Sequence, residues 1–138
     1  MTIDISTLQQ LDKFAKSFSQ ELTPGDLVFL EGDLGSGKTT FTQMLLKHLN
    51  YQDRVKSPTY AIYETYQLAN FTLIHMDLYR LSSPEELYYL AIEEIIDGEN
   101  IVVIEWPEKG LGVLPKYSKA LNFEMISAKK RLLSLDVT

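Results

Sequence analysis

Residues 32–39 bring together residue types that can hold a phosphate group. Gly32, Gly37, Lys38 and Thr39 stand at the spacing G-x-x-x-x-G-K-T. In such a loop the glycines let backbone N–H groups point at phosphate oxygens, the lysine reaches the β and γ phosphates, and the threonine hydroxyl is a ligand for Mg²⁺. A glycine-rich turn is the alternative, but a match of this length is rare by chance at average residue usage. The spacing therefore predicts a phosphate-binding loop (P-loop).

The segments on either side of the loop support this interpretation. The apolar run DLVFLE before it is typical of a buried strand, and an apolar stripe at helical spacing after it predicts a helix over 38–49. Strand, glycine loop and helix are the context that a P-loop requires. The nucleotide-binding residues expected in this stretch are Gly32, Asp33, Leu34, Gly35, Ser36, Gly37, Lys38, Thr39 and Thr40.

Two carboxylates follow apolar runs and are candidates to complete the site. Asp77 ends TLIHMD and Glu105 ends IVVIE. Ligands of open α/β sheets collect at the carboxyl ends of strands, where Mg²⁺ finds oxygen ligands. We expect Thr39, Asp77 and Glu105 around the metal, and Lys38, Asp77 and Glu105 in catalysis. Which carboxylate holds the metal and which orients water stays open.

Other polar residues allow more than one interpretation. Either carboxylate alone could instead face solvent or pair with Arg80, which could also contact phosphate. Thr59, in the SPTY stretch, stands where a switch segment would lie, although composition alone favours a tight turn into an edge strand. His48 and His75 are more typical of surface and packing residues than of metal ligands, because no second histidine stands at ligand spacing.

The remaining patterns alternate between helix and strand. They predict a helix capped by Ser6 and Gln9 that ends before Pro24, a hairpin over 59–79, a helix from Ser83 to a stop at Gly98, a strand at NIVVIEW and a closing pair of strands in the tail. We therefore expect a single domain over 1–138, with an α/β fold of the P-loop NTPase type. It would have three layers (α/β/α), a mainly parallel sheet and antiparallel edge strands.

Composition limits the classes of function. The chain has 138 residues, 45% of them hydrophobic, a formal net charge of -6 and no cysteine. This length suits one core, and the acidic balance leaves no basic field to hold tRNA or DNA unaided. Disulfides and thiolate metal sites are excluded. No apolar run approaches the roughly 18 to 20 residues of a membrane span, so we expect a soluble cytoplasmic protein with no membrane contact.

The sequence favours ATP among the nucleotides. It has neither an N/T-K-x-D element nor a D-x-x-G switch, so nothing would recognise guanine. A small P-loop kinase is a rival, but the chain leaves little room for a lid and an acceptor pocket.

Four motifs taken together resemble a known family. GDLGSGKTTF, SPTY followed by ETY, HMDLYRL and EWPEK, in this order and spacing, are similar to the TsaE (YjeE) family, the P-loop ATPases of bacterial tRNA threonylcarbamoyladenosine (t6A) biosynthesis. The resemblance covers roughly residues 5–137. It implies ATP hydrolysis with Mg²⁺ on a complex of TsaD and TsaB, with tRNA reached only through that complex.

The resemblance also implies roles for single residues. It puts Gly35, Gly37, Lys38, Thr39 and Thr40 on phosphate and Mg²⁺, Thr59 near the γ phosphate, Asp77 and Glu105 on metal and catalysis, and Trp106 beside the nucleotide. Ser36 stands where alanine is common in the family, and Tyr60 where phenylalanine is common. Two hypotheses remain: an ATPase that is weak alone and stimulated by its partners, or a binding module whose docking depends on ATP occupancy rather than hydrolysis.

Overall fold

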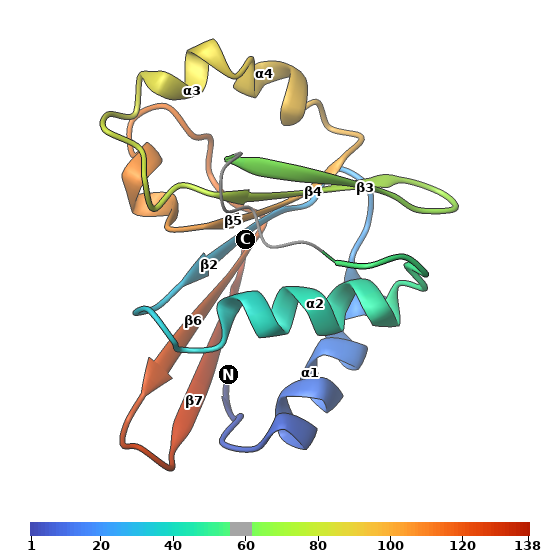
Figure 1. Ribbon diagram of the computed structural model, residues 1–138, viewed down its shortest axis with the longest axis vertical. Helices are drawn as coiled ribbons and strands as arrows, with labels where there is room; N and C mark the ends of the chain where they lie inside the picture. The colour runs from blue at the N-terminus through green and yellow to red at the C-terminus, as the bar shows by residue number, and fades with distance from the viewer. Residues whose placement is uncertain (56–61) are drawn as a thin grey trace.

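The computed structural model describes residues 1–55 and 62–138, and in this part of the chain one seven-stranded sheet forms the centre of the molecule (Figure 1). The strand order is β1-β7-β6-β2-β5-β4-β3. The strands are β1 (Thr2–Asp4), β2 (Leu27–Glu31), β3 (Tyr63–Gln67), β4 (Thr72–Asp77), β5 (Ile101–Glu105), β6 (Lys119–Met125) and β7 (Arg131–Val137).

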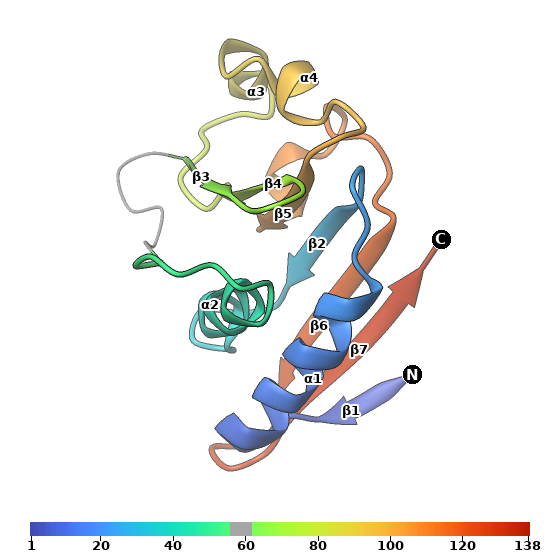
Figure 2. The same ribbon diagram turned by 90° about the vertical axis from the view of Figure 1, so that its right-hand side faces the viewer.

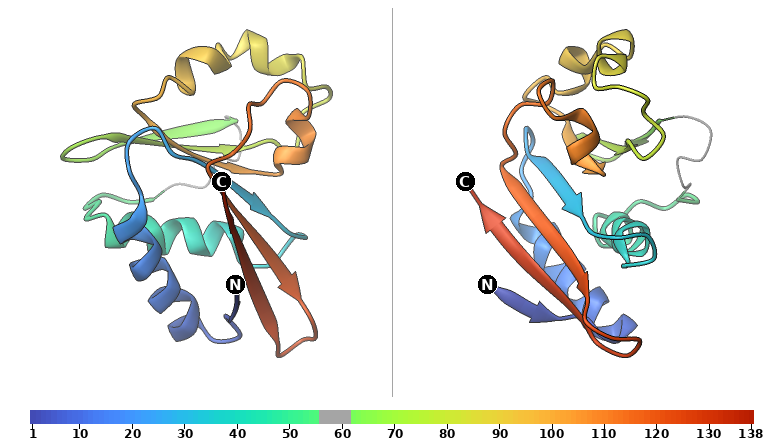
Figure 3. Two further views of the ribbon diagram at one scale, coloured as in Figure 1. Left: turned by 180° about the vertical axis from the view of Figure 1, so that it is seen from behind. Right: turned by 90° about the vertical axis from the view of Figure 1, so that its left-hand side faces the viewer.

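The four central strands are parallel and the outer strands are antiparallel. β6, β2, β5 and β4 run in one direction, whereas β3 pairs with β4, β7 with β6 and β1 with β7 in antiparallel fashion. Figure 3 shows β1 (dark blue) and β7 (red) side by side at one edge. The predicted α/β fold, the hairpin and the closing pair of strands are confirmed, while β1 was not predicted.

Helices cover both faces of the sheet (Figures 1 and 2). α1 (Leu8–Glu21) and α2 (Lys38–His48) pack on one face, against Val28, Val103 and their neighbours. α3 (Glu86–Tyr89), α4 (Ile92–Ile95) and the 3-10 helix η1 (Pro107–Gly110) lie on the other, where Val102 and Ile104 are buried. Because successive strand residues point to opposite faces, β5 is buried on both sides, as the centre of a three-layer fold requires.

Two predictions about helices are wrong in detail. The first helix is capped by Thr7, which exchanges hydrogen bonds with Gln10, and not by Ser6, because the Ser6 hydroxyl donates to Asp4 instead. The single helix expected after Ser83 is two short helices, with Glu85 and not Ser83 before the first of them.

The chain breaks between α3 and α4 at Ala91, whose φ is 55°. Leu87 and Ile92 are both buried against the sheet, at 0% and 3% exposure. In one continuous helix these side chains would point about 140° apart, at 3.6 residues per turn. The break at Ala91 lets both face the core, so tertiary packing overrides the local helix signal.

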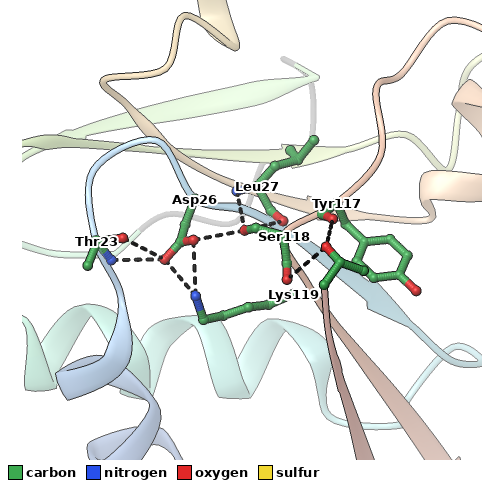
Figure 4. A network of polar contacts seen from close by, with 7 residues as sticks. Thr23, Asp26, Leu27, Tyr117, Ser118 and Lys119 are labelled. Atoms are coloured by element: carbon green, nitrogen blue, oxygen red, sulfur yellow. Dashed lines mark hydrogen bonds and ion pairs between the residues drawn. The ribbon is translucent and has the colours of Figure 1, made fainter.

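A partly buried ion pair joins two distant segments at the amino ends of β2 and β6 (Figure 4). Lys119 Nζ donates to both carboxylate oxygens of Asp26, at 3.0 and 2.9 Å, and the Ser118 hydroxyl donates to one of them at 2.8 Å. Burial alone would raise the pKa of Asp26, but hydrogen bonds from the Thr23 N–H, Lys119 and Ser118 outweigh it and hold the pKa below its ordinary value. The contacts tie the start of β2, the strand that leads into the P-loop, to the start of β6, its parallel neighbour in the sheet.

Candidate functional site

The P-loop connects the end of β2 to the first residue of α2, and glycines give it its shape. Gly32 has a φ of 145°, and a Cβ at this position would lie 2.6 Å from the carbonyl oxygen of Phe123 on β6. Gly35, with a φ of 76°, has open space where its Cβ would be. Only glycine adopts such conformations at no steric cost. The loop therefore packs on β6 at one end and is open to an incoming group in its middle.

Lys38 is held inside this loop by two contacts. Its Nζ donates a hydrogen bond of 2.6 Å to the Gly32 carbonyl and lies 3.8 Å from the centre of the Trp106 ring. Burial lowers the pKa of Lys38, while the carboxylates of Glu105 and Asp77 counteract this shift. A cation over an indole face is stabilised electrostatically. The ammonium is thus a desolvated positive charge at the start of a helix, a suitable partner for phosphate oxygens.

Glu105 receives hydrogen bonds from two elements. The Thr39 hydroxyl, in the first turn of α2, lies 3.4 and 3.3 Å from its Oε1 and Oε2. His75 on β4 contacts Oε2 through Nε2 at 2.6 Å, and both side chains are buried. The prediction that His75 is a packing residue rather than a metal ligand is thus incomplete, because the residue also touches a candidate catalytic carboxylate.

Asp77 lies directly beside Glu105. The parallel register of β4 and β5 pairs these two residues, so both side chains reach the same edge of the sheet. Asp77 is half-buried and accepts a 3.0 Å hydrogen bond from the Tyr79 N–H. Burial raises the pKa of Asp77, and the neighbouring Glu105 charge adds to the rise although the Tyr79 N–H opposes it. A cation beside this pair, one carboxylate buried and the other half-buried, would stabilise the charged form of both.

A pocket of about 240 Å³ opens over these groups. It is lined by Leu34, Gly35, Gly37, Lys38, Thr39, Thr40, Asp77, Tyr79, Glu105, Trp106 and Arg131. Of the predicted residues, the structure therefore brings together most of the loop with both carboxylates and Trp106. Sequence reasoning missed Tyr79, which packs on Trp106 with ring centres 5.1 Å apart, and Arg131 at the start of β7.

Some predicted residues lie elsewhere. Gly32, Asp33 and Ser36 do not line the pocket: Asp33 is exposed, while the buried Ser36 hydroxyl has no hydrogen-bond partner in the described part of the chain. Arg80 is exposed and also outside the lining. Thr59 lies outside the described residues.

A family model described as "Threonylcarbamoyl adenosine biosynthesis protein TsaE" matches residues 5–133. The chain belongs to the TsaE family. The resemblance of its four motifs is thereby confirmed.

Relatives and a solved structure agree with this membership of the TsaE family. A protein from Rickettsia felis named "tRNA threonylcarbamoyladenosine biosynthesis protein TsaE" is 42% identical over 128 residues, covering 92% of this chain and 74% of its own. One of the same name from Haemophilus influenzae is 40% identical over 129 residues, covering 83% and 82%. The crystal structure of YdiB from Bacillus subtilis superposes with a TM-score of 0.83 at 26% identity, covering 99% of this chain and 84% of that one.

The donor set in this TsaE-family chain suits a metal that is shared with a nucleotide. Within residues 1–55 and 62–138, no three His, Asp or Glu side chains cluster closely enough to hold a metal by themselves. Thr39 and the two carboxylates offer oxygen atoms at the mouth of the P-loop, and Mg²⁺ prefers oxygen ligands and commonly takes the rest from phosphate and water. In the same described ranges, no helix is long and apolar enough to span a membrane.

Proposed function

We propose that this TsaE-family protein binds Mg·ATP in the P-loop pocket and hydrolyses ATP as an accessory factor in the t6A modification of tRNA, acting on a complex of TsaD and TsaB. The observation that carries the proposal is the convergence of Lys38 and Thr39 with Glu105 and Asp77 around one pocket. A loop for phosphate, a hydroxyl for the metal and carboxylates at adjacent strand ends are the parts that P-loop hydrolysis requires.

Each side chain has a separate task in this proposal. Lys38 exchanges its contacts with Gly32 and Trp106 for the β and γ phosphate oxygens. The Thr39 hydroxyl, now beside Glu105, would hold Mg²⁺, and the ion would supply positive charge to neutralise the transferred phosphoryl group. Asp77 and Glu105 divide the remaining work between holding the metal shell and orienting the attacking water.

The family resemblance implies TsaD and TsaB as partners, and the charge of the chain supports an indirect contact with tRNA. Its net charge of -6 gives little attraction for the tRNA backbone, so tRNA is contacted through the partner subunits and not by this protein alone. We expect the protein to act in the cytoplasm, where tRNA is modified. Hydrolysis would therefore drive a change in the complex rather than a reaction on a small substrate in this chain.

A second function is favoured by the contacts of Lys38. The Gly32 carbonyl and the Trp106 ring already hold its ammonium, so a nucleotide must rearrange these groups. ATP occupancy could thus set the docking surface without hydrolysis. In this alternative the protein is a nucleotide-gated binding module.

The two functions are separated by a variant that binds ATP but does not hydrolyse it. Glu105→Gln keeps an acceptor for His75 and removes the charge, while Glu94→Gln changes an exposed carboxylate on α4 and serves as the matched control. We expect Glu105→Gln to retain ATP binding in calorimetry and to lose t6A formation in the reconstituted system. Full t6A formation by Glu105→Gln would refute the hydrolytic function and support the gated module.

A further inference from the structure

We propose that His75 is a positioning residue that fixes the orientation of the Glu105 carboxylate for ATP hydrolysis. The inference rests on the proposed function, because it assigns His75 a part in that same reaction. His75 acts through Glu105, so its imidazole needs no contact with the nucleotide.

The contact between the two side chains is short and buried. His75 Nε2 lies 2.6 Å from Glu105 Oε2, and the side chains are 1% and 3% exposed. A hydrogen bond to a charged acceptor is stronger than one between neutral groups, and exclusion of water strengthens it further. The carboxylate is therefore held firmly at one oxygen.

Packing alone does not explain a histidine at this position. Residues 73, 75 and 77 share one face of β4, and the register places His75 beside Val103 of β5. Leu73 and Val103 are fully buried in the core on this face. Leucine would satisfy the same surroundings, whereas the imidazole leaves Nδ1 buried with no hydrogen-bond partner among the described residues. An unpartnered buried polar atom is unfavourable, so the contact with Glu105 must compensate for it.

The same observations define the tautomer of His75. A carboxylate oxygen only accepts, so Nε2 must carry the hydrogen that Glu105 receives. In the neutral ring Nδ1 then carries no hydrogen and is an acceptor. Nδ1 has no hydrogen-bond partner of either kind among the described residues, so the contact with Glu105 is the one that sets the tautomer.

The contacts of Glu105 differ in strength, and this difference gives its two carboxylate oxygens different roles. The Thr39 hydroxyl lies 3.3 Å or more from either carboxylate oxygen and is free to turn to a metal. The hydrogen bond between His75 and Oε2 remains when the Thr39 hydroxyl turns away. Oε1 then remains as the oxygen that can face metal or water, in an orientation that His75 sets.

The first test uses three variants. His75→Leu removes the donor but keeps the volume apolar, His75→Gln restores an N–H that can reach Glu105, and His48→Leu removes a second histidine–carboxylate contact, 2.9 Å to Asp12, remote from the site. With the partner subunits, kcat of His75→Leu is expected to fall about 10- to 100-fold, the range found when groups that orient a ligand are lost. The KM for Mg·ATP should stay near that of the wild type, because the phosphate contacts are untouched. His75→Gln should recover most of the rate, and His48→Leu should match the wild type.

A second readout does not depend on activity. The chain has two histidines, so ¹⁵N-histidine labelling gives two imidazole signals, and the His48→Leu spectrum assigns them. We expect the Nε2–H tautomer for His75 and a shift of its signals in Glu105→Gln. An Nδ1–H tautomer, or signals insensitive to Glu105→Gln, would overturn the proposal.

The failure of this inference differs from the failure of the proposed function. If wild type hydrolyses no faster than Lys38→Ala with the partners present, the proposed function is wrong and the role of His75 falls with it. If wild type hydrolyses ATP and His75→Leu, folded with an unchanged melting temperature, keeps the full kcat, only the role of His75 is wrong.

Discussion

The close approach of Gly32 to β6 makes a quantitative prediction about the P-loop. Alanine at this position must adopt an unfavourable φ near 145° and bring its Cβ within 2.6 Å of the Phe123 carbonyl oxygen. Gly35→Ala must also adopt a positive φ, 76°, but its Cβ meets no atom within 4 Å. The backbone strain alone costs about 1–2 kcal/mol. Overpacking adds about 1–3 kcal/mol, so Gly32→Ala should lose about 2–5 kcal/mol of unfolding free energy, against about 1–2 kcal/mol for Gly35→Ala.

Urea denaturation of the nucleotide-free protein, followed by circular dichroism, measures this difference. Gly112→Ala is the matched control, since Gly112 has a φ of 91°, open space for a Cβ and a position outside the pocket. It should lose as much stability as Gly35→Ala. If Gly32→Ala were no less stable than Gly35→Ala, the contact between the loop and β6 would not exist as described.

Two further predictions concern Trp106 and Asp26. Mg·ATP should draw Lys38 away from Trp106, the single tryptophan, so the fluorescence emission of the indole should change when nucleotide is added. The same titration of Lys38→Ala should leave the emission unchanged. A change in Lys38→Ala identical to that of the wild type would contradict this account. Asp26→Asn should cost about 1–3 kcal/mol of unfolding free energy at neutral pH, because it leaves the partly buried Lys119 ammonium without its carboxylate partner. The pKa of Asp26 in the folded state lies below its ordinary value of 3.8. The ion pair therefore contributes fully to the free energy of unfolding at any pH above 3.8, and this contribution is lost as the pH falls through the lowered pKa. Denaturation curves of wild type and Asp26→Asn should therefore converge in stability only below about pH 4, and a gap that narrows between pH 7 and 5 would refute this assignment.

Local patterns predicted the central part of the fold well. The P-loop lies between a strand and a helix as expected, because apolar periodicity and a run of glycines are properties of neighbouring residues. The same holds for Asp77 and Glu105, since each directly ends an apolar run. Their meeting in space followed from the general rule that parallel strands end at one edge of a sheet.

Long-range contacts were beyond such patterns. β1 has three residues, which are too few to show the alternation of apolar and polar residues that marks a strand. It forms because β7 pairs with it. Arg131 reaches the pocket through the β6–β7 hairpin, and no local signal connects it to the P-loop. His75 is the instructive case: the spacing H-x-D places it on the same strand face as Asp77, but its contact with Glu105 depends on the register of two strands distant in sequence.

The central claim is tested most directly by measuring ATP hydrolysis by the purified protein, alone and with TsaD and TsaB, with Lys38→Ala as the control. We predict slow hydrolysis alone, a marked rise with the partners and loss of that rise in Lys38→Ala, because the ammonium now held by the Gly32 carbonyl and the Trp106 ring is the group that must meet the phosphates. Tight ATP binding with no turnover under either condition would contradict the account, as would a rise in hydrolysis that Lys38→Ala retains.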